Sequence, residues 1–249
     1  MLALTVSRAL ASDHMRVAVV TPYYNETDQQ LERCIESVVN QSYHDVTHIM
    51  VADGMAHSWQ PSSNRFEHIT LPHSHGDAGA TPRAIGALSA FSREFDAVSF
   101  LDADNWYEPN HIEVMVDRMS REQVDAVAAT RTIYGMDGAK LYVDRIESNA
   151  DNMVDTNCMF LSRRTAYFMP FWITPPSHRL VSDRVFWESA IANGMKIARS
   201  DIPTVSYVTK WAWHYHHAGV PIPDDSVWME RDAQGNYKQI KNKDRSITK

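Results

Sequence analysis

Two aspartates one residue apart follow a short apolar run near the middle of the chain. The run, residues 98–101, contains β-branched and aromatic residues, which is typical of a strand buried in a sheet. Asp102 and Asp104 begin where the run ends, and open α/β sheets bind ligands at the carboxyl ends of their strands. Two such carboxylates can bind one Mg²⁺ or Mn²⁺ ion that shares its coordination with substrate phosphates. The alternative is a polar loop whose aspartates cap the next helix.

Two earlier apolar runs end at the same kind of polar position. Residues 17–20 lead into the loop 21–26, and residues 48–52 are followed directly by Asp53. Residues 27–40 between them have apolar side chains at helical spacing. A strand, a helix and a strand this close together predict a right-handed crossover in a parallel sheet. We therefore expect the loop and Asp53 at the same sheet edge as the two central aspartates.

A glycine-bearing loop, residues 73–80, precedes another predicted helix. We expect Ile85, Leu88 and Phe91 to face the core from this helix. Arg83 lies in its first turn, where the helix dipole favours an acidic residue instead. The arginine could hold an anion there, or it could be a surface residue whose stem covers the sheet.

The composition excludes several classes of protein. With 249 residues, 44% of them hydrophobic, the chain can form one large α/β domain. A net charge of −7 argues against nucleic acid as the main partner. Cys34 and Cys158 lie in apolar patterns, so we expect neither a disulfide nor a zinc site, and a cytoplasmic location. No apolar run approaches the roughly 20 residues of a membrane helix. Peripheral membrane contact and self-association are left open.

Five segments in order carry a resemblance to a known family. They are residues 20–26 (VTPYYNE), 31–43 (LERCIESVVNQSY), 51–54 (VADG), Arg83 with Gly86, and 100–104 (FLDAD). Together they resemble family-2 glycosyltransferases with the GT-A fold, over roughly residues 16–217. The resemblance implies an α/β fold: a Rossmann-like, mostly parallel central sheet flanked by helices, with a smaller acceptor-side subregion.

The resemblance also implies an activity and a set of site residues. The expected enzyme is an inverting transferase that uses a nucleotide diphosphate sugar, most often a UDP-sugar, with Mn²⁺ or Mg²⁺ bridging the diphosphate. The residues implied to line the nucleotide site are Pro22, Tyr24, Glu26, Asp53, Arg83 and Asp102. Asp53 would hydrogen-bond the base, Asp102 would contact the ribose or the metal, and Asp104 would be the principal metal ligand. The chain departs from the family at Ala84 and Asn105, where an asparagine and a third acid are common.

Asp183 is the candidate general base, at the start of a helix expected from residue 182. A sugar hydroxyl is a poor nucleophile, and a positioned base contributes about 10² to 10⁴ in rate. The competing interpretation is a helix cap, because Ser182 and Asp183 are both good capping residues. Family members usually have a glutamate where Ser182 stands, so a catalytically silent binding module is the alternative function. A sugar-phosphate nucleotidyltransferase is disfavoured, since residues 21–26 lack that class's glycine-rich loop with an arginine.

Residues 211–219 (WAWHYHHAG) form a second unusual stretch. Imidazole can complete a Mn²⁺ site, and the resemblance points to His216 as a metal ligand. If the stretch alternates like a strand, His214 and His216 share a face. The alternative is a surface cluster without a ligand. Further candidates for contacts to the acceptor or sugar are Asp155, Trp106, Trp213 and His214. Asp155 could equally be a turn acid.

The predicted organisation has three parts. Residues 1–15 are an N-terminal extension, and residues 16–220 form the transferase domain. Within the domain, the nucleotide-binding half covers about 16–105 and the acceptor half about 106–220, with a last edge strand at 196–199. Residues 221–249 are mixed in charge and read as a polar tail or solvated helix. Without the Gln-X-X-Arg-Trp sequence of processive synthases, we expect single transfers to a glycan or lipid-linked acceptor.

Overall fold

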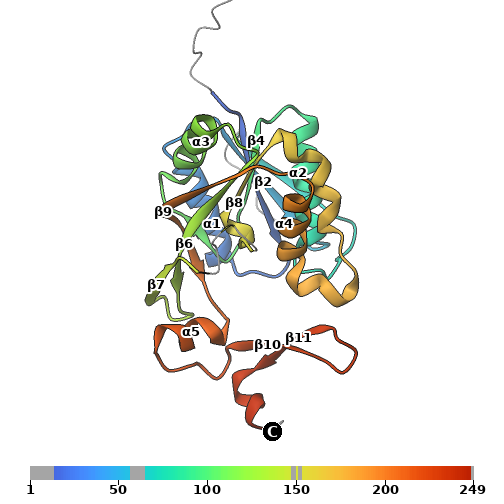
Figure 1. Ribbon diagram of the computed structural model, residues 1–249, viewed down its shortest axis with the longest axis vertical. Helices are drawn as coiled ribbons and strands as arrows, with labels where there is room; N and C mark the ends of the chain where they lie inside the picture. Colours follow the sequence, from blue (N-terminus) through green and yellow to red (C-terminus); the bar gives the residue numbers. More distant parts are fainter. Residues whose placement is uncertain (1–13, 57–64, 147–149, 151–152, 248–249) are drawn as a thin grey trace, which may run out of the picture.

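The computed structural model describes residues 14–56, 65–146, 150 and 153–247, and its centre is a nine-stranded sheet (Figure 1). The strands lie in the order β3-β2-β1-β4-β8-β6-β9-β5, with β7 paired to β6. Their bounds are β1 Val17–Tyr23, β2 Val46–Ala52, β3 Phe66–Thr70, β4 Ala97–Phe100, β5 Trp106–Tyr107, β6 Ala126–Tyr134, β7 Lys140–Asp144, β8 Met159–Ser162 and β9 Ile197–Val208. Strands β1 to β4, β6 and β9 run in one direction, and β5, β7 and β8 run in the other. The predicted mostly parallel α/β sheet is confirmed.

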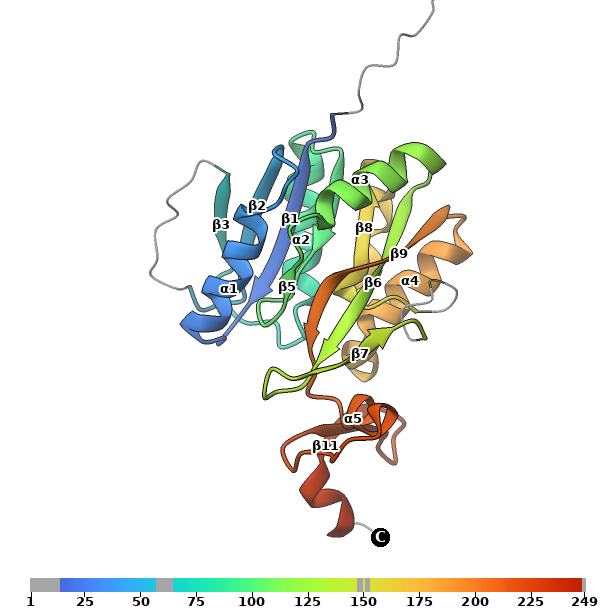
Figure 2. The ribbon, with the colours of Figure 1, turned by 90° about the vertical axis from the view of Figure 1, so that its left-hand side faces the viewer.

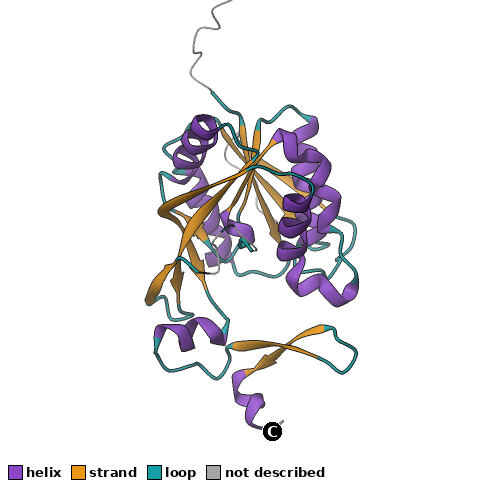
Figure 3. Ribbon diagram, in the orientation of Figure 1, coloured by secondary structure: helices purple, strands orange, loops and turns teal. Residues whose placement is uncertain are grey.

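Helices cover both faces of this sheet (Figure 3). On one face lie α1 (Asp28–Val39) and α3 (His111–Glu122), and on the other α2 (Ala80–Ser92), α4 (Ser182–Ala192) and the 3₁₀ segment η2 (Arg163–Trp172). The remaining elements are η1 Thr156–Cys158, η3 Pro176–Val181, α5 Ala212–Ala218, β10 Val227–Arg231, β11 Tyr237–Lys241 and η4 Asn242–Ile247. Within the part of the chain that the structure describes, every helix is too short or too polar to span a membrane.

The parallel strands β1, β2 and β4 end at one edge of the sheet, as the sequence predicted. β1 pairs in parallel with both β2 and β4, and all seven of its residues are buried. Strands covered by helices on both faces are continuous apolar runs for this reason. The polar loops that follow β1, β2 and β4 therefore begin side by side.

Helix α2 contradicts one detail of the sequence analysis. Leu88 is 45% exposed, so its predicted place in the core is wrong, whereas Phe91 is buried. The buried face consists mainly of small residues, including Ala84, Gly86 and Ala87. A Cβ atom at Gly86 would lie 2.5 Å from a methyl group of Val20, so the small residues let α2 approach β1 closely. Spacing of the large apolar residues alone could not reveal this face.

The predicted edge strand at residues 196–199 is wrong in extent and place. Strand β9 continues to Val208 and lies between β6 and β5 inside the sheet. Its register with β6 shifts near Thr130, and Pro203 pairs with that residue at the irregularity. The bulge accommodates Pro203 within the strand, whereas a proline in the sequence indicates the end of a strand.

The C-terminal segment differs most from expectation. The stretch considered as a possible alternating segment contains helix α5, and the predicted polar tail contains an antiparallel hairpin, β10–β11, followed by η4. These elements lie beyond the carboxyl ends of β1 and β4, at one end of the molecule (Figure 2). Of the predicted extension 1–15, residues 1–13 lie outside the described residues.

Candidate functional site

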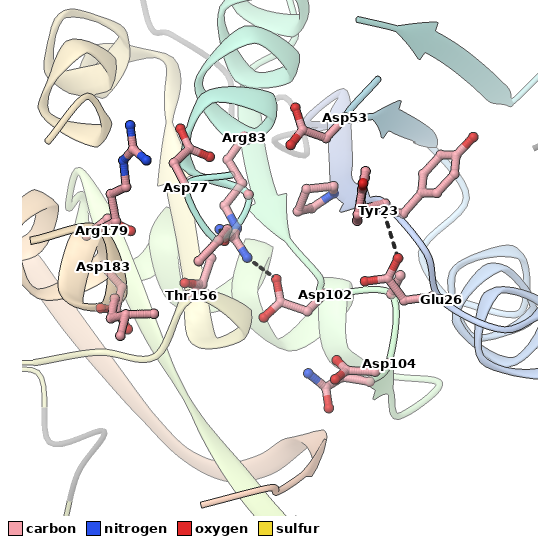
Figure 4. Close-up of a pocket in the computed structure, with 18 of the residues that line it drawn as sticks. Tyr23, Glu26, Asp53, Asp77, Arg83, Asp102, Asp104, Thr156, Arg179 and Asp183 are labelled. Carbon is pink, nitrogen blue, oxygen red and sulfur yellow. Dashed lines mark hydrogen bonds and ion pairs between the residues drawn. The ribbon is translucent and has the colours of Figure 1, made fainter. Parts of the chain in front are cut away.

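A cavity of about 550 Å³ opens at the edge where β1, β2 and β4 end (Figure 4). Nine of the predicted site residues line it: Pro22, Tyr24, Glu26, Asp53, Arg83, Asp102, Asp104, Asp155 and Asp183. They come from both halves of the chain, with Tyr23 and Glu26 on one side of the view and Arg179 and Asp183 on the other. We call this space the donor cavity.

The donor cavity carries an excess of negative charge. Seven carboxylates line it, from Glu26, Asp53, Asp77, Asp102, Asp104, Asp155 and Asp183. Three cationic side chains accompany them, from Arg83, Arg179 and Lys210. A phosphate-bearing ligand would be repelled by this balance unless a cation came with it. The chemistry of the lining therefore fits a divalent metal ion bound together with a phosphate group.

Asp102 is held at the centre of the cavity by two partners. The buried Arg83 forms an ion pair with Asp102 and also donates to the carbonyl oxygen of Ala78 at 2.7 Å. The side-chain amide of Asn157 donates to Oδ2 of Asp102 at 3.0 Å, while its oxygen accepts from the Asp102 backbone N–H at 2.6 Å. Arg83 is thus a buried residue that orients Asp102, and the surface alternative is wrong.

Gly79, at the start of α2, makes room for this arrangement. It has a left-handed backbone with φ +81°, which glycine adopts without strain. A Cβ atom there would lie 3.0 Å from Nη1 of Arg83 and 3.1 Å from Cβ of Pro22. The glycine therefore lets two predicted site residues pack against the same turn.

A buried polar network continues from Asn157 into the second half of the domain. Its side-chain amide also donates to Oδ1 of Asp155 at 2.8 Å. Asp155 forms an ion pair with Arg131 at 2.7 Å, and Arg131 forms another with Asp144 at 2.9 Å. Asp155 also accepts the backbone N–H of Asn157, so it is a turn acid as well as a residue that lines the cavity. The network fixes the donor-side loops relative to β6 and β7.

Asp104 is the carboxylate best placed to bind a cation. Burial, followed by the charges of Asp102 and Glu26, raises the pKa of Asp104 to about 7, against the opposing charge of Lys210. Within the described residues, its carboxylate takes part in no ion pair with a protein cation. No group of three or more metal-ligating side chains occurs there either. Asp104 and Asp102 are therefore the carboxylates that could hold a cation here, and phosphate oxygens would have to complete its coordination, as is common for Mg²⁺.

The loop that carries Asp104 is held in place by Arg33 of α1. Arg33 donates to the backbone carbonyl of Asp104, and its guanidinium lies 4.3 Å from the ring centroid of Trp106. Trp106 also contacts Tyr134, with ring centroids 5.1 Å apart. Trp106 lines neither the donor cavity nor a second cavity, described below, that also borders Asp183.

Asp53 accepts hydrogen bonds from residues of the loop that follows β3. Burial would raise its pKa, but hydrogen bonds from the side chain and backbone of His75 and from Ser74 outweigh burial and lower it. The shortest of these bonds, from Nδ1 of His75, is 2.7 Å. Asp53 is thus an ionised carboxylate fixed at the wall of the cavity.

Asp183 lies in the first turn of α4, facing the cavity. The N-cap of α4 is Val181, without a side-chain cap bond, so Asp183 is not the helix cap. Its carboxylate accepts the backbone N–H of Arg184 at 2.8 Å. Burial, and then the charge of Asp155, raise its pKa to about 6, although the Arg184 bond and the charges of Arg83 and Arg131 oppose them. A carboxylate with this pKa is ionised at neutral pH yet basic enough to accept a proton.

A second cavity of about 380 Å³ opens on the other side of Asp183. We call it the aromatic cavity, because its lining includes Tyr207, Trp211, Trp213, Trp228 and Tyr237. The two cavities share five lining residues, namely Asp155, Leu180, Asp183, Tyr207 and Trp211. Asp183 therefore stands where a ligand of one cavity would meet a ligand of the other.

The histidine segment lies differently from the prediction. Because residues 212–218 are helical, His214 and His216 do not share a face. His214 is buried, bonded through Nδ1 to the hydroxyl of Thr209 at 2.5 Å, and lines the aromatic cavity together with Trp213. His216 is exposed, stacks on Trp213 with ring centroids 5.9 Å apart, and lines neither cavity. The structure does not bring His216 to the aspartates.

Several residues of the site were missed from the sequence, among them Asp77 of the donor cavity, Tyr237 of the aromatic cavity and four others. Arg179 and Lys210 bring positive charge to the donor cavity, and Asn157 and Arg131 form the network behind it. Of these four, only Arg131 left a usable signal, since it is a single charge within an otherwise apolar and threonine-rich strand. The other three stand in segments without a periodic pattern.

Comparison with known proteins places the chain in a family. The model of Glycosyl transferase family 2 matches residues 18–189. Glycosyltransferase GlyA of Streptococcus pneumoniae is 25% identical over 44% of this chain and 16% of its own length. Putative glycosyltransferase EpsH of Bacillus subtilis is 30% identical over 45% of this chain and 32% of its own length. The chain thus matches less than half of these relatives.

Solved structures of S. aureus TarS have the same fold at low sequence identity. TarS 1–349 has a TM-score of 0.60 and 15% identity, over 82% of this chain and 63% of that one. The same TarS fragment has also been solved in complex with UDP, with a TM-score of 0.58, and with UDP-GlcNAc, with a TM-score of 0.59. The order of motifs, the GT-A fold and the family match agree: the chain belongs to glycosyltransferase family 2.

Proposed function

We propose that this protein transfers a sugar from a nucleotide diphosphate sugar to a hydroxyl group, with inversion at the anomeric carbon. The observation that carries the proposal is the position of Asp183 between two cavities of different chemistry. One is polar and suits a phosphate-bearing donor with a metal ion, and the other is aromatic. A transferase needs two such sites that meet at the reacting atoms.

The donor is a UDP-sugar in this proposal. The support is the structural likeness to TarS, which binds UDP and UDP-GlcNAc. Tyr24 and Glu26 follow the end of β1 and line the cavity together with Asp53. Glu26 lies beside Tyr23 in Figure 4, and we propose that the nucleoside binds on this side. Glu26 accepts the backbone N–H of Tyr24 at 2.7 Å, which keeps this loop folded against the cavity.

Asp104, with help from Asp102, would hold Mn²⁺ or Mg²⁺. When bound, the ion neutralises the charge that develops on the leaving diphosphate. Lys210 and Arg179 are the cationic side chains of the cavity without a carboxylate partner among the described ion pairs. They would attract the same diphosphate, Arg179 from the side opposite Glu26 (Figure 4).

Asp183 would act as the general base in a single displacement. Its carboxylate takes the proton of the acceptor hydroxyl while the hydroxyl oxygen bonds to the anomeric carbon of the donor. The bond between that carbon and the diphosphate oxygen breaks, and the nucleotide diphosphate leaves with the electron pair. Attack from the face opposite the diphosphate inverts the configuration. The acceptor would be a glycan or a lipid-linked saccharide.

Calorimetric titration with UDP, GDP, dTDP and CDP tests the donor site. Each nucleotide is titrated with and without Mn²⁺, on the wild type and on Asp104→Ala. We expect UDP to bind only with Mn²⁺, and Asp104→Ala to weaken binding by about 100-fold or more, because even residues behind a metal ligand contribute 10- to 100-fold. Glu113→Gln, an exposed acid in α3, is the matched control and should bind like the wild type. Absence of binding by all four nucleotides would contradict the proposal.

Turnover separates the enzyme from a silent binding module of the same fold. UDP-GlcNAc is incubated with the protein and Mn²⁺, and the release of UDP is measured. We expect release by the wild type, with water as the acceptor, and its loss in Asp183→Asn. Nucleotide binding without any release would support the binding module instead.

A further inference from the structure

The C-terminal hairpin presents one face to the two cavities. Side chains alternate along β10 and β11, and the pairing register places Val227, Met229, Tyr237 and Gln239 on the same face. Val227, Met229 and Tyr237 line the aromatic cavity, and Gln239 lines the donor cavity. Arg231 and Lys241 share this face but line neither cavity, and Trp228 borders the aromatic cavity from the other face. The hairpin as a whole therefore forms a wall of the site.

The opposite face of the hairpin is occupied by η4. Trp228 donates from Nε1 to the side-chain oxygen of Asn242 at 3.0 Å, and the guanidinium of Arg245 lies 4.1 Å from its ring centroid. Lys238, also on this face, is exposed. η4 thus supports the hairpin from outside, while Tyr237 faces inward beside His178 of η3, with ring centroids 6.3 Å apart.

The ring of Tyr237 is held in place as a platform. Arg231 lies on the same face, with its guanidinium 4.4 Å from the ring centroid, and donates to the phenol oxygen at 2.5 Å. Trp211, which lines the same cavity, donates from Nε1 to the hydroxyl of Tyr207 at 3.1 Å. Rings fixed by such contacts lose little entropy when a ligand stacks on them.

The charges of the aromatic cavity are balanced. Asp155 and Asp183 face Arg131 and Arg184 there, and Arg131 is already paired with Asp144 and Asp155. A ligand with phosphate groups would meet two carboxylates and little unpaired positive charge. A pyranose without charge suits the lining better, because its C–H face is apolar and its hydroxyls can reach Asp183.

We propose that the hairpin β10–β11 forms the acceptor site with Trp211, and that the acceptor is an uncharged pyranose which stacks on Tyr237 and Trp211. The inference rests on the proposed function, and it deepens it by naming the acceptor class and the segment that recognises it. Residues 227–241 lie beyond residues 18–189, the part of the chain that the family model matches.

Saturation-transfer-difference NMR with methyl glycosides tests this site in the full chain. The probes are the methyl glycosides of glucose, galactose, N-acetylglucosamine, mannose and rhamnose, with glycerol 3-phosphate as the charged probe. UDP and Mn²⁺ are present to fill the donor cavity without turnover. We expect at least one glycoside to bind, tenfold or more weaker binding to Tyr237→Ala, and binding within twofold of the wild type for Tyr237→Phe. Lys238→Ala is the matched control, one residue away on the outer face, and should bind like the wild type.

Several outcomes would overturn the inference. They are binding of no glycoside, binding of glycerol 3-phosphate in preference to every glycoside, and glycoside binding that Tyr237→Ala leaves unchanged. Equal loss in Tyr237→Ala and Tyr237→Phe would also overturn it, because stacking needs only the ring. UDP affinity is measured on each variant by calorimetry. If UDP binds normally while the glycosides fail, only the acceptor site is wrong; if UDP also fails, the proposed function fails with it.

Discussion

The two cavities that meet at Asp183 are built in different ways. The donor cavity stands at the ends of parallel strands in the middle of the sheet, and its lining is dominated by carboxylates. The aromatic cavity is formed largely by η3, the start of α4, α5 and the hairpin, which lie outside the sheet. The sheet edge fixes charged groups for one ligand, and segments outside the sheet provide rings for the other. We propose that the first cavity binds the donor and that the segments outside the sheet bind the acceptor.

Removal of the residue at the junction has the largest expected effect. Asp183→Asn should lower kcat by about 10² to 10⁴, because a base in this position contributes that much. Binding of UDP with Mn²⁺ should stay within twofold of the wild type. Steady-state release of UDP and calorimetry measure the two quantities. Glu188→Gln, an exposed acid in the same helix, serves as the control. A kcat within fivefold of the wild type would remove Asp183 from the chemistry.

Substitution of Arg131 tests whether its ion pairs stabilise the residues between the two cavities. Arg131→Met leaves Asp144 and Asp155 buried without their guanidinium partner, so the free energy of unfolding should fall by about 3–5 kcal/mol. Arg164, which pairs with Asp125 at the surface, is the matched control, and Arg164→Met should cost less than about 1 kcal/mol. Urea unfolding followed by fluorescence measures both. Equal losses in the two variants would mean that the network does not stabilise the residues between the cavities.

The dependence of kcat/KM on pH should reveal the raised pKa of Asp183. Its pKa is raised to about 6, first by burial and then by the charge of Asp155. The base must be ionised, so kcat/KM should be level above pH 6 and fall about tenfold per unit below it. Mn²⁺ is kept saturating, because the pKa of Asp104 is raised to about 7 and protons compete with the metal there. If kcat/KM instead began to fall near pH 4, the ordinary range of an aspartate, burial would not be raising the pKa of Asp183.

The smallest effect is expected at Trp106, which lines neither cavity. Trp106→Phe weakens the contact with Arg33 and should lower the free energy of unfolding by about 1 kcal/mol. The KM for the acceptor should stay within twofold. A tenfold rise in that KM would show that Trp106 contacts the acceptor.

The donor side of this comparison could be predicted from the sequence, for a physical reason. Apolar runs such as residues 48–52 must be buried strands, and parallel strands place the residues after them at one edge. Asp53, Asp102 and Asp104 therefore came together from local pattern and topology alone. Their hydrogen-bond partners, such as Asn157, could not be predicted in this way. A single polar residue has no periodicity that would indicate which carboxylate it binds.

The acceptor side could not be predicted in the same way. Residues 211–219 have polar and aromatic residues in turn, which fits a strand, yet α5 forms because His214 and Tyr215 are buried against the domain. Polar and apolar residues are not separated onto the two faces of the hairpin, because Trp228 and Ile240 share the outer face with Glu230 and Lys238, so residues 227–241 read as a tail. Short elements whose burial is decided by distant segments carry little signal of their own.

The stereochemistry of the first product tests the central claim most directly. Proton NMR follows the anomeric signal while the protein acts on UDP-GlcNAc, whose sugar is α-linked, in the presence of Mn²⁺. Attack by a hydroxyl or water activated at Asp183, opposite the diphosphate, predicts that the β-anomer appears first and that Asp183→Asn forms none. Initial release of the α-anomer, or an unchanged rate in Asp183→Asn, would contradict a displacement at the junction of the two cavities.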